Sequence, residues 1–247
     1  MGFEAGRHGV SLVSPISPHA SDAQQRVLRV ASRALGRANL VHAYGHCSLR
    51  LDDEHLLVCA AMPMGLVTNE PGVVVPIRGP LPPGVLGEVC VHQKIYAQRP
   101  EVGAVVRSMP RYLMSLSSAC ITPVPRHGPG SYFAPIVPLW RDVQLVRSES
   151  QAEGVVETLG TSRAVVMRAN GAIVVGTTLE EAVTMTWFLE DAARVEYELR
   201  AIGAANGAVF SEEDSRRRAT TAGRIIERMW DYLTADDAEV YAGTVRS

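Results

Sequence analysis

Residues 88–110 read EVCVHQKIYAQRPEVGAVVRSMP, and this stretch decides the fold of the chain. A helical pattern begins at residue 86 and ends at residue 98, because a proline at position 100 disfavours helical backbone before it. The apolar run over residues 102–106 then predicts a buried strand. Glu88 and His92 are four residues apart on the expected helix, so they share one face. The stretch therefore predicts a helix followed by a buried strand, with a carboxylate and an imidazole on the same side of the helix.

The rest of the chain predicts further helices and strands. Ser21-Asp22-Ala23-Gln24 has the form of a capping box, and the apolar spacing behind it predicts an amphipathic helix over residues 21–40. Two short apolar runs flank Asp52-Asp53-Glu54, which predicts a hairpin of strands at 47–51 and 55–60. The other expected elements are a strand at 73–77, a helix at 111–119, an ordered loop at 122–138, a hairpin of strands 163–168 and 172–176 around Ala169-Asn170-Gly171, and helices at 178–202 and 211–233. This order predicts a sheet layered with helices.

Composition and charge exclude several classes of protein. The chain has 247 residues, of which 47% are hydrophobic, so it can bury one substantial core. We expect a flexible arm at residues 1–17 and a single domain at 18–247. The formal charge is -2 and neither sign collects in a long run, which predicts no nucleic acid and no anionic membrane as partner. The expected partners are a small-molecule substrate and further copies of the chain.

Cysteine spacing and local motifs predict a cytoplasmic protein without a cofactor. The four cysteines are widely spaced and form no C-x-x-C, which is typical of reduced thiols. The first residues lack the apolar stretch of a signal peptide, and no later segment reaches the roughly 18 to 20 apolar residues of a membrane span. Gly-x-Gly-x-x-Gly, P-loop and nucleophile-elbow patterns are absent from the sequence, so no nucleotide cofactor is expected.

Three motifs resemble the class II aldolase/adducin family in their order and spacing. They are YGHCSLR at residues 44–50, the stretch at 88–106, and GAIVVGTTLEEA at 171–182. The resemblance covers residues 21–203 and implies an α/β fold of three layers, α/β/α, with a mostly antiparallel central sheet. It also implies a fourfold-symmetric homotetramer with active sites at subunit boundaries. Gly45-His46 and Met62-Pro63 look closest to the branch that contains dihydroxyaromatic carboxylate decarboxylases and secondary-metabolism enzymes.

The resemblance also shows what this chain has replaced. In the family, His-x-His-Pro and a later Asn-His-Gly hold a divalent metal through three imidazoles, and a Glu four residues before a helix His is the acid/base. Here Arg107, Met109 and Asn170 stand at the three metal positions, whereas Glu88 matches the acid/base. Arginine has no lone pair for a metal, methionine offers a soft thioether, and one amide oxygen is a poor substitute. The replacements imply that the site binds no metal in the family's manner.

Glu88 and Arg107 are the candidate catalytic residues. Apolar neighbours of Glu88 predict desolvation and a raised pKa, which suits proton transfer. The Arg107 guanidinium could take the place of the metal and donate a fixed fork to a carboxylate or enolate oxygen. The structural alternatives are a solvated helix residue for Glu88 and a surface ion pair for Arg107.

Six further residues are candidate substrate contacts: His46, Ser48, His92, Met109, His127 and Asn170. Met109 could instead be simple packing, although methionine also lines apolar pockets. Asn170 could serve only the turn, because Asn-Gly is favoured in type I′ hairpins. The histidines and Ser48 could stabilise local structure or face solvent.

The leading hypothesis is a metal-independent lyase or synthase that makes or breaks a C–C bond in a small, non-phosphorylated carbonyl, imine or hydroxyaromatic metabolite of secondary metabolism. Decarboxylation and aldol- or Pictet–Spengler-type condensation both fit. A fixed cation cannot generate a metal-bound hydroxide, so hydrolysis is disfavoured. Two alternatives remain open: a non-catalytic, adducin-like binding or assembly module, and a metallo-lyase with relocated ligands drawn from His46, His92 and His127.

Overall fold

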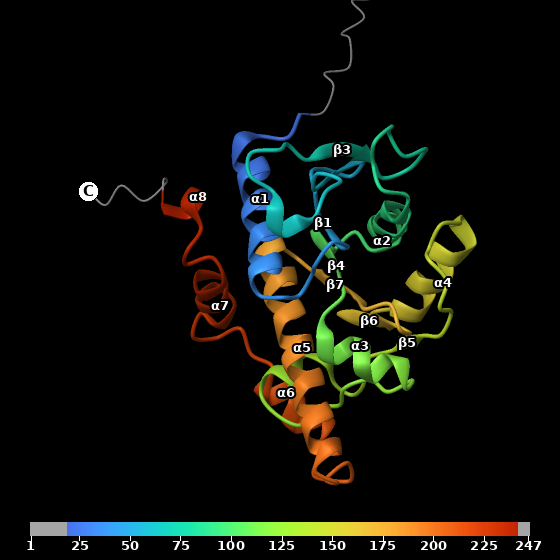
Figure 1. The fold of residues 1–247 in the computed structure, drawn as a ribbon, viewed down its shortest axis with the longest axis vertical. Coiled ribbons are helices and arrows are strands. Elements are labelled where there is room, and N and C mark those ends of the chain that lie inside the picture. The colour runs from blue at the N-terminus through green and yellow to red at the C-terminus, as the bar shows by residue number, and fades with distance from the viewer. Residues whose placement is uncertain (1–18, 242–247) are drawn as a thin grey trace, which may run out of the picture.

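The computed structural model describes residues 19–241, and a seven-stranded sheet lies at its centre (Figure 1). The strands are β1 (His46–Arg50), β2 (His55–Val58), β3 (Val73–Pro76), β4 (Ala104–Ser108), β5 (Leu139–Trp140), β6 (Ala164–Met167) and β7 (Ala172–Gly176), in the spatial order β3-β2-β1-β4-β7-β6-β5. The β5–β6 pair is parallel and the other described pairs are antiparallel. The expected mostly antiparallel sheet is confirmed, whereas the expected arm at 1–17 lies outside the described residues.

Helices cover both faces of the sheet. They are α1 (Asp22–Arg37), α2 (Cys90–Gln98), α3 (Arg111–Ser118), α4 (Glu149–Leu159), α5 (Leu179–Ala201), α6 (Glu212–Arg218), α7 (Ile225–Leu233) and α8 (Ala238–Tyr241), with short 3-10 turns η1 (Met64–Leu66), η2 (Gly87–Val89) and η3 (Pro129–Phe133). Helices α1 and α5 contact β1, β4 and β7, while α4 contacts β5 and β6 and packs against α2. This arrangement confirms the three-layer α/β/α fold. Within residues 19–241, no helix has the length and apolar character that a membrane crossing requires.

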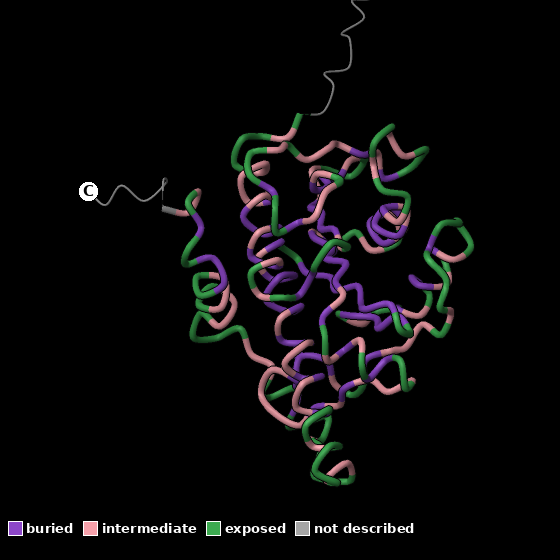
Figure 2. The backbone as a smooth tube through the Cα atoms, viewed as in Figure 1, coloured by how far each residue is buried: buried purple, intermediate pink, exposed green. Residues whose placement is uncertain are grey.

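The five inner strands of the sheet are almost entirely buried, whereas the edge strands β3 and β5 are mostly half-buried (Figure 2). Every residue of β4 is buried, because helices cover both faces of this strand. Side chains alternate between the faces of a strand, so His46 and Ser48 of β1 point to one face and Cys47 points to the other. Cys47 meets Ser32 of α1, whereas Ser48 meets His92 of α2. The α2 face of the sheet therefore carries the polar side chains.

Two expected helices differ from the structure. The expected single helix over residues 211–233 is wrong, since α6 ends at Arg218 and α7 begins at Ile225. Gly223 and Arg224 between them adopt left-handed φ values of 75° and 56°, which a continuous helix cannot contain. The expected helix over 86–98 begins as a 3-10 turn, so α2 itself starts at Cys90. The sequence-based prediction also missed α4, α8 and β5.

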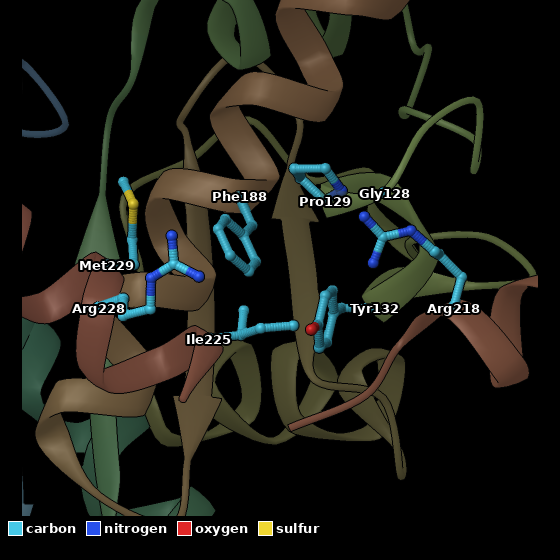
Figure 3. Close-up of a pocket in the computed structure, with 8 residues that line it drawn as sticks. All are labelled: Gly128, Pro129, Tyr132, Phe188, Arg218, Ile225, Arg228 and Met229. Atoms are coloured by element: carbon cyan, nitrogen blue, oxygen red, sulfur yellow. The ribbon is translucent and has the colours of Figure 1, made fainter. Parts of the chain in front are cut away.

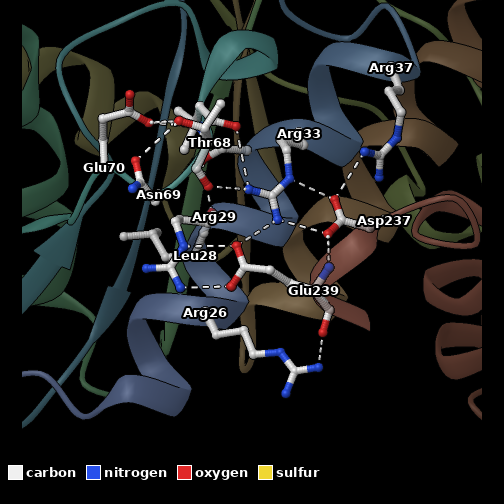
Figure 4. Close-up of polar contacts among 12 residues, drawn as sticks. Arg26, Leu28, Arg29, Arg33, Arg37, Thr68, Asn69, Glu70, Asp237 and Glu239 are labelled. Atoms are coloured by element: carbon white, nitrogen blue, oxygen red, sulfur yellow. Dashed lines mark hydrogen bonds and ion pairs between the residues drawn. The ribbon is translucent and has the colours of Figure 1, made fainter. Parts of the chain in front are cut away.

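Two carboxylates attach the C-terminal end of the described chain to α1 (Figure 4). Asp237 accepts hydrogen bonds from Arg33 at 2.7 and 2.8 Å and from Arg37 at 3.0 Å. Glu239 accepts from Arg29 at 2.9 and 2.7 Å and from Arg33 at 2.9 Å. The three arginines are spaced by four residues and so share one face of α1. Burial acts to raise the pKa of Asp237, but the hydrogen bonds from Arg33 and Arg37 outweigh it and lower the pKa to about 2.

Asp237→Asn should lower stability at neutral pH by about 2 kcal/mol, because the folded-state pKa is well below the ordinary value. A carboxylate with a lowered pKa contributes stability above its unfolded pKa of 3.8 that is lost as the pH falls towards about 2. Urea unfolding between pH 7 and pH 2 should therefore show a flatter acid limb for the variant. Asp236→Asn, at an exposed neighbouring position, is the control, and equal losses in both variants would contradict the prediction.

Gly171→Ala should destabilise the fold by roughly 3 kcal/mol, because it combines a left-handed φ of 76° with a steric overlap. A Cβ at this position would overlap the carbonyl oxygen of Ser108 on β4. Gly203→Ala is the matched control, since Gly203 has a φ of 79° but no atom within 4 Å of the added Cβ. The control should lose only about 1–2 kcal/mol in urea unfolding. Equal losses would show that the contact with β4 adds nothing.

Candidate active site

A cavity of about 880 Å³ lies where the end of β4 meets the start of β1. Its polar side chains are His46, Glu88, Arg107, Arg147 and Asn170, and its larger apolar side chains are Tyr44, Met62, Pro63, Leu86, Met109 and Leu145. A mostly apolar cavity with a few convergent polar groups is typical of a small-molecule site. Five of the eight site residues expected from the sequence, namely Glu88, Arg107, His46, Met109 and Asn170, line this one cavity.

Glu88 reaches the cavity from η2, at the start of α2. The β1–β4 register places His46 directly opposite Arg107, so both side chains point to the face that α2 covers. Glu88 Oε2 lies 3.6 Å from His46 Nε2 and 3.8 Å from Arg107 Nε. Three elements that are distant in the sequence thus bring a carboxylate, an imidazole and a guanidinium together.

Arg107 is an interior residue with 3% of its surface exposed. Its Nη1 donates to the carbonyl oxygen of Ser108 at 2.6 Å, and its Nη2 donates to Asn170 Oδ1 at 2.9 Å. Burial lowers the pKa of Arg107 and Glu88 acts in the opposite sense, but a guanidinium stays protonated in proteins. These contacts rule out a surface ion pair and fix the orientation of the buried guanidinium.

Asn170 lies in the turn between β6 and β7, but the turn does not need an asparagine. The left-handed φ values fall on Ala169 and Gly171, at 51° and 76°, and not on Asn170. The type I′ explanation for this residue is therefore wrong. Because a guanidinium only donates, Arg107 must meet the amide oxygen, which fixes the orientation of the amide. Its Nδ2 finds no hydrogen-bond partner among the described residues.

The pKa of Glu88 is lowered, whereas the sequence predicts a raised value. The nearby His46 imidazole is the largest cause, burial opposes it, and Arg107 lowers the pKa further. The apolar neighbours of Glu88 are visible in the sequence, but His46 and Arg107 approach from distant strands. Burial also lowers the pKa of His46, with Glu88 opposing and Arg107 reinforcing this shift. At neutral pH the site therefore pairs an ionised carboxylate with a neutral imidazole.

Ser48 and His92 lie behind His46 and do not line the cavity, which corrects their expected role as direct substrate contacts. Both are fully buried. Ser48 Oγ is 2.6 Å from His92 Nδ1 and 2.9 Å from the hydroxyl of Tyr96, and His92 Nε2 is 2.9 Å from His46 Nδ1. These two residues contact His46 and the interior, so any effect on a substrate passes through His46.

His127 is also outside this cavity in the described chain, so its expected substrate contact is not formed there. Its Nε2 is hydrogen-bonded to Asp191 Oδ2 of α5 at 2.8 Å. The next residues, Gly128 and Pro129, belong to a separate cavity of about 460 Å³ (Figure 3), which is also lined by Tyr132, Phe188, Arg218, Ile225, Arg228 and Met229. The ordered loop at 122–138 thus packs on α5 and not on the Glu88 site.

The residues at the three metal positions do not fit a divalent metal. A buried guanidinium occupies the place of the first imidazole, and it already uses the amide oxygen of Asn170. The relocated set of His46, His92 and His127 is not assembled either, because the first two are hydrogen-bonded to each other and the third contacts Asp191. Over residues 19–241, no group of three His, Cys, Asp or Glu side chains is arranged to hold a metal.

The sequence-based prediction missed two polar residues that belong to the site. Arg147 brings a second cation to the cavity wall just before α4. The capping box of Ser148 and Gln151 is a local signal that could have identified that helix, but it does not show that α4 packs beside α2. Tyr96 lies four residues after His92, so helical spacing alone places it on the same face as Glu88.

Known proteins share this architecture. A 3,4-dihydroxyphthalate decarboxylase from Terrabacter sp. is 29% identical over an alignment of 208 residues, and the match covers 77% of this chain and 87% of that protein. The crystal structure of L-fuculose-1-phosphate aldolase from Thermus thermophilus is 27% identical, covers 75% of this chain and 98% of its own, and has a TM-score of 0.67. An aldolase II superfamily protein from Pseudomonas syringae has the same fold, with a TM-score of 0.72 at 23% identity over 92% of this chain and 96% of its own.

The family model for the class II aldolase and adducin N-terminal domain matches residues 26–197. This range begins in α1, contains the whole sheet and ends in α5. It also includes each residue that lines the Glu88 cavity. The chain therefore belongs to the class II aldolase and adducin family.

Proposed function

We propose that this protein is a metal-independent lyase that acts on a C–C bond of a small, carboxylated hydroxyaromatic compound, with decarboxylation as the leading reaction. This proposal rests on the position of Glu88. Its carboxylate lies 3.6 Å from His46 and 3.8 Å from Arg107, at the polar end of an otherwise apolar cavity. A buried cation beside an ionised carboxylate suits a reaction in which one proton moves and an oxyanion develops.

In the proposed reaction, Glu88 takes the proton of a ring hydroxyl that is ortho or para to the carboxylate. Arg107 holds the resulting oxyanion, whose charge raises electron density on the ring. Glu88 then returns the proton to the ring carbon that carries the carboxylate. The C–C bond to the carboxylate breaks, its electron pair restores the aromatic ring, and carbon dioxide leaves. The phenolate product takes a proton from water, so Glu88 ends the cycle ionised.

Two features favour this substrate class. The Terrabacter relative is named for the decarboxylation of 3,4-dihydroxyphthalate, which is an aromatic dicarboxylate. Here Arg107 and Arg147 provide two cations against the single carboxylate of Glu88, and Leu86 gives the cavity an apolar wall. Aldol- or Pictet–Spengler-type condensation would use the same proton transfers. The homotetramer, the cytoplasmic location and a place in secondary metabolism stay predictions.

Glu88→Gln should reduce release of carbon dioxide from 3,4-dihydroxyphthalate or a related hydroxylated aromatic acid by roughly 100- to 10,000-fold, because the amide cannot move the proton. Arg107→Lys should lower the rate of carbon dioxide release roughly 100-fold or more, since an ammonium lacks the fixed fork of the guanidinium.

The lowered pKa of Glu88 keeps the carboxylate ionised, so the acid limb of the pH–rate profile should lie below 4.5, the ordinary pKa of a glutamate. The measurement is carbon dioxide release against pH for each variant.

Matched controls separate these effects from general damage. Glu157→Gln and Arg141→Lys make the same changes at exposed positions outside the cavity, and both should keep full activity. An unchanged turnover in Glu88→Gln would remove the proposed base. Binding of aromatic acids without any turnover in the wild type would instead favour the adducin-like binding module.

Protein purified without chelator or affinity metal should contain zinc, manganese and iron at far below one equivalent, because a guanidinium stands at the first metal position. Treatment with a chelator should leave carbon dioxide release unchanged. Elemental analysis together with the chelator assay checks both points. One equivalent of metal with chelator-sensitive turnover would overturn metal independence.

A further inference from the structure

We infer that the buried residues Tyr96, Ser48 and His92 hold His46 in one tautomer, with its N–H at Nε2 facing the cavity. His46 is then a neutral hydrogen-bond donor for the oxyanion, a role that rests on the proposed function. The tautomer itself rests only on the hydrogen-bond geometry. Tyr96, Ser48 and His92 are positioning residues, because they act on the substrate through His46.

The four side chains form one continuous chain between a strand and a helix. His46 and Ser48 are two residues apart on β1, so they share a face, and His92 and Tyr96 are four residues apart on α2. The groups alternate between the two elements at 2.9 Å from Tyr96 to Ser48, 2.6 Å from Ser48 to His92, and 2.9 Å from His92 to His46. All four are buried, at 3% exposure or less, so water does not compete for these bonds.

The hydroxyl of Tyr96 sets the direction of the chain. Burial raises the pKa of Tyr96 well above its usual range, so this hydroxyl keeps its proton and needs an acceptor. Ser48 Oγ is the side-chain acceptor within reach among the described residues, and its own hydrogen must then go to His92 Nδ1. His92 therefore carries its proton on Nε2 and donates to His46 Nδ1. The proton of His46 is left on Nε2, which faces Glu88 at 3.6 Å.

The opposite direction is disfavoured at both ends of the chain. If His46 Nδ1 donated to His92, the last hydrogen would sit on Tyr96 with no side-chain acceptor among the described residues. An unsatisfied buried donor of this kind disfavours a state by roughly 5- to 150-fold. At the other end, the lone pair of His46 Nε2 would face the ionised carboxylate of Glu88. Both effects favour the same tautomer.

The chain orients His46 and does not conduct protons. If His46 gave up its Nε2 proton and drew another through the chain, the charge would end on a buried Tyr96 phenolate. Because burial raises the pKa of Tyr96 well above its usual range, this phenolate does not form at neutral pH. Glu88 is therefore left as the group that moves the proton, while His46 Nε2–H and the unpartnered Asn170 Nδ2 add donors beside Arg107.

The test is nitrogen NMR of protein labelled with ¹⁵N-histidine, without any substrate. The ring nitrogens of His46 and His92 are assigned by comparison with His46→Gln and His92→Gln. We expect a protonated Nε2 and an unprotonated Nδ1 in both rings at neutral pH. The opposite tautomer, or an averaged mixture, in either ring would overturn the inference. Because no turnover is measured, failure of the proposed reaction would not affect this result.

Variants of the chain test its cause. Tyr96→Phe removes the terminal donor and should convert His46 to a mixture of tautomers, and Ser48→Ala should do the same if the tyrosine variant does not fold. Tyr132→Phe is the matched control, since its hydroxyl donates to the carbonyl oxygen of Thr220 outside the site. An unchanged His46 tautomer in Tyr96→Phe would overturn the positioning role. Where turnover is measurable, Tyr96→Phe should lower kcat roughly 10-fold with little change in KM.

Discussion

The antiparallel register between β1 and β4 is the constraint on which the site depends. It sets His46 opposite Arg107 and therefore sends both side chains to the face covered by α2. A shift of β1 by one residue would turn His46 towards α1 and place Cys47 under Glu88, while Arg107 stayed on the α2 face. The same register continues through β7, where Ile173 lies opposite Arg107, and the turn between β6 and β7 carries Asn170. The backbone pairing of the sheet thus determines which polar side chains lie at this end of the cavity.

The contacts of the buried Arg107 explain how the fold remains stable without the three metal-binding histidines of the family. An unpaired charge in the interior costs several kcal/mol, so removing three imidazoles and leaving a lone guanidinium would not be stable. Here the cation has Glu88 at 3.8 Å and donates to Ser108 and Asn170, which offsets much of that cost. A single positive charge with fixed donors can stabilise an oxyanion. A guanidinium cannot activate water as a divalent metal does.

Local signals predicted most of the fold and only part of the site. The capping box at Ser21 and the polar turn at residues 52–54 specify their elements from a few neighbours, and both appear as expected. The sequence-based predictions fail where residues distant in the sequence determine the pKa or the position of a side chain. The pKa of Glu88 depends on His46 and Arg107, which the β1–β4 pairing brings beside it. Ser48 is hydrogen-bonded in the interior to both His92 and Tyr96. Spacing along the sequence shows which residues share a face, but not what the opposite face carries.

The orientation of His46 decides how the proton is handled in the cavity. Its Nδ1 lone pair is used by His92, so the ring cannot act as a base towards a substrate without breaking a buried hydrogen bond. Glu88 is then the base of the polar end, and the groups around it are donors. The site thus holds one ionised carboxylate, which can accept a proton, beside three donors: a neutral imidazole, a guanidinium and an amide N–H. Acid and base roles are divided in this way where the local environment gives neighbouring groups different protonation states. Such a site has the groups needed to remove a proton and to hold the anion that results.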